Sequence, residues 1–131
     1  MTETGIVSTK MLIEIATEKL AEISEFGNDG VLLSNPGTKA KFPVCVMQPP
    51  LQTPIYMGRG WNLSITCEVW AATLTEAAGL FDKVKCKFLE LNFMQNGNSP
   101  PVYDEITKKW RFGGYFEARW NAITNTLERN V

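Results

Sequence analysis

The residues best suited to catalysis in this chain are two neighbouring carboxylates and one thiol. Asp104 and Glu105 are adjacent, so on a strand their side chains would point to opposite faces and could not work as an acid–base pair. Cys86 lies in the lysine-rich stretch 83–87, where a nearby cation can lower the pKa of a thiol. The chain contains no histidine, which removes the usual base for a cysteine or serine nucleophile. The sequence therefore favours a protein that is not an enzyme. We expect Asp104 and Glu105 to lie in a solvated hairpin.

Signatures of phosphate, metal and cofactor sites are also missing. The run Gly58-Arg59-Gly60 has two glycines, but neither a lysine nor a helix start follows, so no phosphate-binding loop is predicted. Cys45, Cys67 and Cys86 are odd in number and widely spaced, which fits neither a zinc site nor a disulfide framework. All three lie in apolar runs, which favours buried free thiols in a reducing compartment. We expect no cofactor and no metal.

The composition is that of one globular domain covering residues 1–131. Hydrophobic residues make up 44% and charged residues 21% of the chain, which are ordinary values for a folded domain. The formal net charge is -1, which argues against nucleic acid as the main partner and permits close association of like copies. The first residues show no export signal, and no apolar run approaches the length of a membrane span. We therefore expect a protein that begins in a cytoplasm and has no membrane partner.

Two helices are predicted around the candidate residues. The first begins at Ser8 or Thr9 and runs to about Phe26, with apolar residues at helical spacing. The second follows a capping box formed by Thr73 and Glu76 and runs to about Phe93. Its apolar stripe is continuous and consists of Leu74, Ala77, Ala78, Phe81, Val84, Phe88 and Leu91.

The remaining elements are predicted strands and loops. Strands are expected at 31–33, 42–48 and 63–71, followed by a hairpin of 102–106 with 109–112 and a single final strand over 115–128. The prolines at 49–54 and the run 96–101 predict loops, and Gly113-Gly114 predicts a bend or bulge. The order of elements indicates an α+β fold, with a mostly antiparallel sheet of four to six strands packed with two main helices.

The final strand is the basis for predicting assembly. As a straight strand, residues 115–128 would extend about 46 Å, whereas a compact domain of this size is only about 36 Å across. The strand must then bend, or its end must pair with another chain and satisfy its exposed backbone groups there. Candidate interface residues are the aromatic and charged side chains outside the clear core pattern, namely Tyr56, Arg59, Trp61, Trp110, Glu117, Arg119 and Arg129.

The run Tyr115–Asn130 resembles the last strand of small tail-terminator, or tail-completion, proteins of long-tailed bacteriophages. The order of the other elements is compatible with that family, including a strand that begins near Phe42-Pro43. The resemblance implies a tail-terminator-like domain that forms a hexameric ring at the head-proximal end of the tail. Such a ring ends tail-tube polymerisation and enables head–tail joining, with the tail-tube protein and head-completion or neck proteins as partners. DNA would pass through the lumen without sequence-specific binding.

If the resemblance holds, the protein is a virion component of the tail or neck, assembled in the host bacterial cytoplasm. The charged last strand would then line the lumen or the subunit seam, and the loop around Arg59 would contact the tube. Two alternatives stay open. One is a protein-binding adaptor that uses the aromatic loop and an exposed edge strand. The other, which the sequence favours least, is an enzyme of unfamiliar type that uses Asp104, Glu105 or Cys86.

Overall fold

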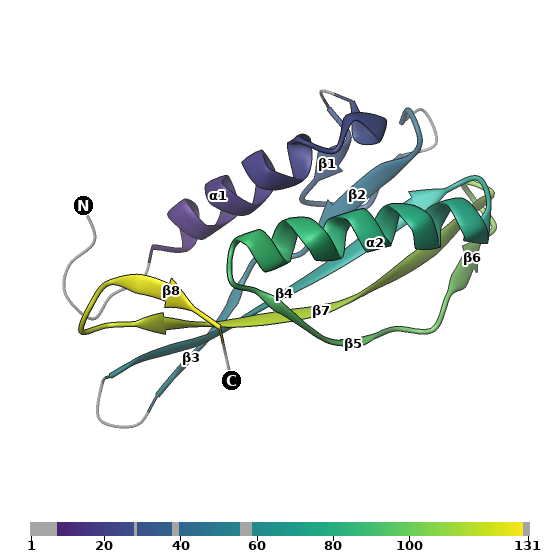
Figure 1. The fold of residues 1–131 in the computed structure, drawn as a ribbon. Helices are drawn as coiled ribbons and strands as arrows, with labels where there is room; N and C mark the ends of the chain where they lie inside the picture. The colour runs from purple at the N-terminus through teal and green to yellow at the C-terminus, as the bar shows by residue number, and fades with distance from the viewer. Residues whose placement is uncertain (1–7, 28, 38–39, 56–58, 130–131) are drawn as a thin grey trace.

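The computed structural model describes residues 8–27, 29–37, 40–55 and 59–129, and it confirms the α+β fold. Within these residues the sheet has eight strands, more than the four to six expected, and two helices pack against it (Figure 1). The elements are α1 (Thr9–Ala21), a short 3₁₀ turn η1 (Ser24–Phe26), β1 (Val31–Leu32), β2 (Val44–Met47), β3 (Leu51–Pro54), β4 (Gly60–Ala71), α2 (Leu74–Glu90), β5 (Met94–Asn98), β6 (Val102–Asp104), β7 (Lys109–Asn121) and β8 (Thr126–Glu128).

Two long strands form the middle of the sheet. β4 and β7 pair in antiparallel register from Gly60 opposite Asn121 to Ala71 opposite Trp110. Short strands flank this pair in succession, with β2 and β3 along β4, and β6, β5 and β8 along β7. β1 adds to β2 in parallel. The backbone groups of both central strands are therefore paired on two sides over most of their length.

The segment 115–128 is two strands, so the prediction of one long final strand is wrong. β7 ends at Asn121, and β8 returns along it with Glu128 opposite Arg119. The turn has a local cause, because the side-chain Oδ1 of Asn121 accepts hydrogen bonds from the backbone N–H groups of Ile123 and Thr124, at 2.9 and 3.2 Å. The segment therefore turns back on its own chain, which is the bend that was one of the two expected outcomes.

The final strand does not overhang the domain as expected, because the domain is not nearly spherical. The molecule is elongated along the β4–β7 pair (Figure 1), so a long strand does not overhang it. β7 begins at Lys109 instead of 115, and β4 accompanies it over nearly its whole length. No backbone argument for pairing with another chain remains at β7.

Two segments expected as loops are strands. β3 pairs with β4 despite the prolines around it, because it lies at an edge, where one side needs no donors. β5 pairs with β7 through a register shift between Gln95 and Asn98. The irregularity predicted at Gly113-Gly114 therefore lies on β5, whereas β7 runs through both glycines in unbroken register with β4.

The helices begin where their capping residues predict and end earlier than expected. The side-chain oxygen of Ser8 accepts a hydrogen bond from the Met11 N–H, and that of Thr73 accepts one from the Glu76 N–H. The Glu76 carboxylate in turn accepts from the Ala72 N–H, close to the predicted capping box. The first helix ends at Ala21 and is followed by η1, which carries the chain on to Phe26.

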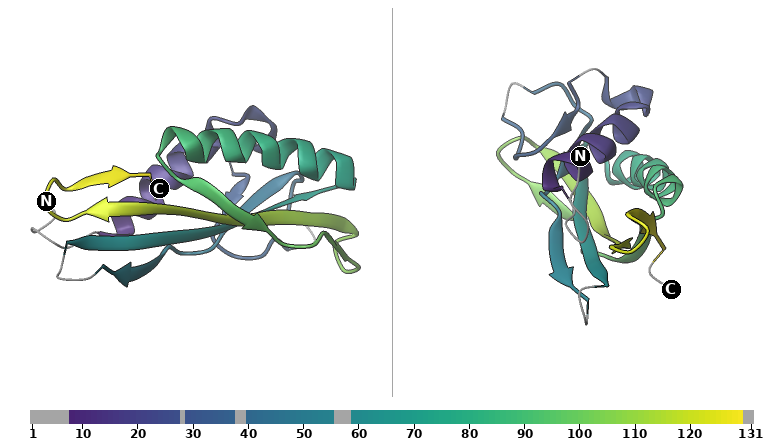
Figure 2. Two further views of the ribbon diagram at one scale, coloured as in Figure 1. Left: turned by 60° about the horizontal axis from the view of Figure 1, so that its bottom comes forward. Right: turned by 90° about the vertical axis from the view of Figure 1, so that its left-hand side faces the viewer.

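Both helices pack on one face of the sheet and enclose the main core between the layers (Figure 2). From β4 the core takes alternate residues, which confirms the predicted buried face: Leu63, Ile65, Cys67, Val69 and Ala71. From β7 it takes Phe116, whose ring stacks on that of Phe88 from α2 at 4.3 Å between centroids. Cys45 and Cys67 are buried as expected, but Cys86 is exposed on α2.

Ion pairs join α1 and η1 to α2 at the surface. Lys19 Nζ lies 3.1 Å from Glu90, Lys87 Nζ lies 2.9 Å from Glu22, and Lys83 pairs with Glu25. The hydrogen bond from Lys87 lowers the pKa of Glu22 below its ordinary range, and that from Lys83 does the same for Glu25. These pairs are exposed, so each contributes little by itself, and their combined role is to fix how the helices lie together.

Candidate interaction surface

Among the described residues, one face of the sheet carries no helix (Figure 2). The register aligns its side chains in rows across four strands, and one such row runs from Leu51 on β3 through Ser64 and Glu117 to Met94 on β5. We call the uncovered part of this side the open face. It consists of Leu51, Asn62, Ser64, Thr66, Met94, Tyr115, Glu117 and Arg119.

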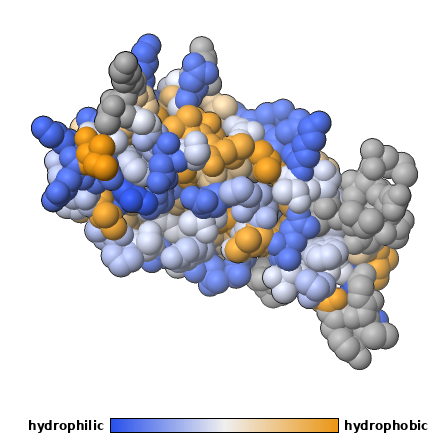
Figure 3. All heavy atoms as spheres, turned by 180° about the vertical axis from the view of Figure 1, so that it is seen from behind, coloured by the Kyte–Doolittle hydropathy of each residue, from blue (hydrophilic) through white to orange (hydrophobic). Residues whose placement is uncertain are grey.

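The open face is polar in its middle and apolar at its sides. Leu51 is 69% exposed at the edge formed by β3, and Met94 is 38% exposed on the other side. Tyr115 lies between them and is 42% exposed. Seen from behind, the molecule shows separate groups of apolar side chains among mostly hydrophilic ones (Figure 3). A contiguous apolar area with a polar rim marks a surface that binds other proteins, and these three side chains are the candidates for such an area.

Two of the predicted interface residues, Glu117 and Arg119, lie on the open face but do not pair with each other. Glu117 accepts a hydrogen bond from the Asn96 side chain at 2.7 Å. Arg119 donates to Glu128 at 3.4 Å, and Asn121 donates to the same carboxylate at 3.1 Å. The prediction that Glu117 and Arg119 share one side of a strand is correct. Each of them bonds to a residue of a neighbouring strand, Glu117 to β5 and Arg119 to β8.

The other predicted residues are dispersed. Arg59 is exposed just before β4, where its carbonyl accepts a hydrogen bond from the Ala122 N–H at 2.9 Å. Arg129 is exposed beyond the end of β8. Tyr56 lies outside the described residues. The structure therefore places Arg59 beside the β7–β8 turn, and it does not bring all the predicted residues into one site.

The two predicted tryptophans are partly buried. Trp61 lies within β4, and not in a loop, and its side chain packs against the main core. Trp110 lies at the start of β7 and meets the ring of Tyr103 edge-on, with 5.4 Å between the centroids. The expectation of an aromatic loop at Trp61 is wrong because β4 begins at Gly60 and takes this residue into the sheet.

A second, smaller core is bordered by a charged cluster, which the sequence did not predict. Arg111 donates to both carboxylate oxygens of Glu68, at 3.0 and 3.2 Å, and its guanidinium lies 4.6 Å from the ring centre of Trp70. The Trp70 indole N–H donates to the same carboxylate at 3.3 Å. Beneath it, Trp70 packs with Val44 and Val46. Glu68 and Trp70 are two apart on one strand, which places them on one face, but only the pairing of β4 with β7 brings Arg111 to them.

The edge formed by β3 is poorly suited to adding another strand. The Ile55 N–H bonds to the Gly60 carbonyl, so within the β3–β4 register Gln52 and Pro54 direct their backbone groups away from β4. Proline has no N–H to offer there, which leaves Gln52 as the single outward donor of β3. Prolines on an edge strand are a common device against edge-to-edge pairing.

The three catalytic candidates have structural or solvent-exposed positions. The carboxylate of Asp104 accepts from the Thr107 backbone N–H at 2.9 Å and from its hydroxyl at 2.7 Å, and these bonds lower the pKa of Asp104. Glu105 is exposed in the same turn. Cys86 lines a shallow groove of about 300 Å³, together with Lys83 and Lys87, whose ammonium groups pair with glutamates. The three side chains do not converge.

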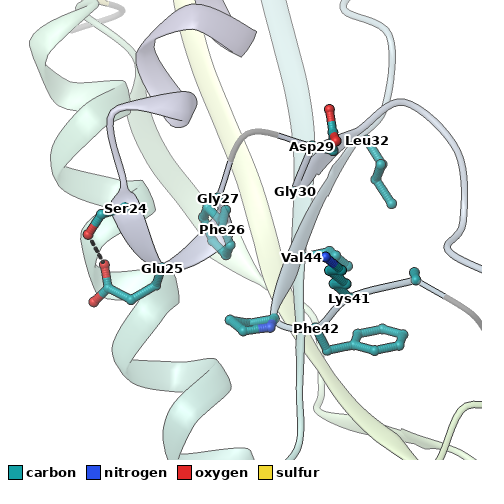
Figure 4. A pocket seen from close by; sticks show the side chains of 12 residues that line it. Ser24, Glu25, Phe26, Gly27, Asp29, Gly30, Leu32, Lys41, Phe42 and Val44 are labelled. Carbon is teal, nitrogen blue, oxygen red and sulfur yellow. Dashed lines mark hydrogen bonds between the residues drawn. The ribbon is translucent and has the colours of Figure 1, made fainter.

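A hollow of about 580 Å³ lies between η1 and the start of β2 (Figure 4). In its lining Ser24 donates to Glu25 at 3.3 Å, and Lys41 and Phe42 line the hollow from the other side. Polar groups do not converge on one point there, as they do in ligand sites. Across the described ranges, no cluster of three or more Cys, Asp or Glu side chains could hold a metal ion, and no helix is long and apolar enough to cross a membrane.

Comparisons with known proteins do not add a family to these observations. No protein-family model matches the chain, and neither the curated proteins nor the solved structures contain a match.

Proposed function

We propose that this chain is a structural subunit that assembles with copies of itself, and that the assembly is a ring at the head-proximal end of a bacteriophage tail. In this role it ends tail-tube polymerisation and offers a surface for head–tail joining. The observation that supports self-assembly is the open face, where Leu51, Tyr115 and Met94 expose apolar area across four strands. The phage role rests on the resemblance of the run 115–130 to the last strand of tail terminators.

Assembly through side chains fits this chain better than assembly through strand addition. β7 is paired on both sides and β3 presents Pro54 outward, so neither strand offers a neighbouring copy a continuous row of free backbone groups. A stable interface takes about 800 Å² from each partner, roughly a tenth of the 7602 Å² that the chain exposes. In a ring, each subunit gives two such areas, one to each neighbour. In this proposal the open face contributes to the contact between neighbouring subunits.

Mass photometry and negative-stain electron microscopy of the purified protein test the proposal. We expect closed rings, with six copies as the expected number. In the Arg119→Glu variant, the changed charge on the open face should weaken the rings. Glu14→Lys, on the exposed side of α1, is the control and should leave them intact. A monomer at every concentration, with and without added tail tubes, would contradict the proposal.

The adaptor alternative loses part of its support. It used an aromatic loop and an exposed edge strand, but Trp61 packs against the core and the β3 edge carries Pro54, whereas β5 remains an exposed edge. We expect Trp61→Ala to reduce stability and not to abolish binding of one particular partner. Self-assembly is therefore the function that we propose.

A further inference from the structure

The two ends of the β4–β7 pair differ in a complementary way. At one end, the turn between β7 and β8 presents Ile123, which is 74% exposed. At the other end, the turn between β6 and β7 borders a groove of about 240 Å³, lined by the apolar side chains of Pro36, Trp70 and Ile106. β7 separates the ends by about 40 Å, so the isoleucine cannot reach the groove of its own chain.

Both ends are held in place by side chains. The Asn121 side chain accepts hydrogen bonds from the backbone N–H groups of Ile123 and Thr124, and these bonds fix the turn that carries the isoleucine. Asp104 accepts two hydrogen bonds from Thr107, which fixes the turn that borders the groove. Preformed surfaces lose little conformational entropy when they associate.

Charge also differs between the ends. Arg59 lies next to the β7–β8 turn, since its backbone carbonyl accepts a hydrogen bond from the Ala122 N–H. Asp104 lines the groove and Glu105 is exposed beside it. Of the lysines on that turn, Lys109 places its ammonium 5.2 Å from the ring centre of Phe42, whereas Lys108 is exposed. A cation therefore stands beside the projecting isoleucine, whereas the groove end carries two carboxylates together with exposed Lys108.

We infer that the β7–β8 turn of one copy seats in this groove of the next copy, with Ile123 against Pro36 and Ile106 above the buried Trp70, and with Arg59 facing Asp104 and Glu105. The inference rests on the proposed self-assembly and names, at the two ends of the β4–β7 pair, one contact area for each of the two neighbours. A contact between two different ends is heterologous, so it repeats from copy to copy and closes into a ring when the rotation between copies allows.

Disulfide trapping tests this contact directly. In a Cys86→Ser background the remaining cysteines are buried, and Asn35→Cys at the groove is combined with Thr124→Cys at the turn. Under mild oxidation we expect a ladder of covalent oligomers on a non-reducing gel. The two single variants should give dimers only when mixed. Glu18→Cys on α1 replaces Asn35→Cys in the control, and equal cross-linking by that control would overturn the inference.

Ile123→Glu provides a second readout, with Leu89→Glu on α2 as the matched control because Leu89 is also an exposed apolar residue. We expect Ile123→Glu to weaken association by about tenfold or more, and Leu89→Glu to leave it unchanged. Arg59→Glu should also weaken association, and Glu105→Arg in the same chain should restore it. Circular dichroism establishes that each variant is folded.

The outcomes separate this contact from the proposed function. Rings without cross-linking would overturn the contact and leave the ring proposal standing. A cross-linked ladder of open chains would support the contact and contradict the closed ring. A monomer that never cross-links would contradict both.

Discussion

Gly113 on β7 lies directly opposite Glu68 on β4, and a Cβ at this glycine would stand 2.6 Å from the Glu68 Cα. The same Cβ would overlap the carbonyl oxygen of Cys67. The two central strands therefore approach more closely here than any residue with a side chain would allow. This close approach, and not a bulge, is the reason for glycine at a point where β7 stays in register.

Gly113→Ala should destabilise the fold strongly, because backbone atoms that cannot move away occupy the space for the new methyl group. We expect a loss of about 3 kcal/mol in the free energy of unfolding, measured by urea denaturation. Gly79→Ala is the control, since a Cβ on that α2 residue meets nothing within 4 Å. It should stabilise the protein by about 0.5–1 kcal/mol. A similar small effect for both variants would contradict the close approach.

Glu68→Gln should cost about 1–3 kcal/mol in the free energy of unfolding. The substitution removes the charge that Arg111 contacts through two oxygens, in a cluster where only 20% of the Glu68 side chain is exposed. Glu128→Gln is the matched control, because its bond to Arg119 is longer and both partners are more exposed. It should cost less than about 1 kcal/mol. Equal losses would show that the Glu68 cluster is an ordinary surface pair.

Stability should fall in acid as the glutamates between the helices become protonated. The pKa values of Glu22 and Glu25 are lowered from 4.5, so their contribution is present above pH 4.5 and is lost as the pH falls through the lowered values. The pKa of Lys87 is raised from 10.5, so its contribution is lost only as the pH rises above that value. Thermal unfolding between pH 2 and 7 measures the acid limb. Lys83→Gln with Lys87→Gln should flatten it, whereas Lys10→Gln should not.

Pro54→Val should promote aggregation through the edge of the sheet. The substitution adds a backbone N–H that points away from β4, and it places a residue that favours strands at an unprotected edge. Light scattering at constant protein concentration should rise faster than for the parent chain. Pro101→Val, in the exposed loop before β6, is the control and should not change the rate. If both variants aggregate alike, Pro54 does not protect the edge.

Local signals predicted much of the fold, and long-range pairing explains most of the errors. Helix starts at Ser8 and Thr73 were predictable because capping chemistry involves only neighbouring residues. The buried side of β4 was predictable from alternation. The turn at Asn121 was missed because the run after it contains no glycine or proline, although an asparagine side chain can hold a turn by itself.

The candidate surface was less predictable than the fold. Glu117 and Arg119 were correctly assigned to one side of a strand, but which strands lie beside them depends on register. The Glu68–Arg111 cluster joins residues that are distant in the sequence, so no local pattern indicates it. Exposed Ile123 and Ile106 carry no special signal in the sequence, because a lone isoleucine is more often buried than presented in a turn.

The pairing of β4 with β7 also has a consequence for synthesis. β4 leaves the ribosome well before its main partner, because α2, β5 and β6 must all be translated in between. During that interval only the short strands β2 and β3 can pair with it, so the backbone groups of β4 that face β7 have no partner strand. Nascent chains of this protein should therefore depend on chaperones more than the small size of the mature domain suggests.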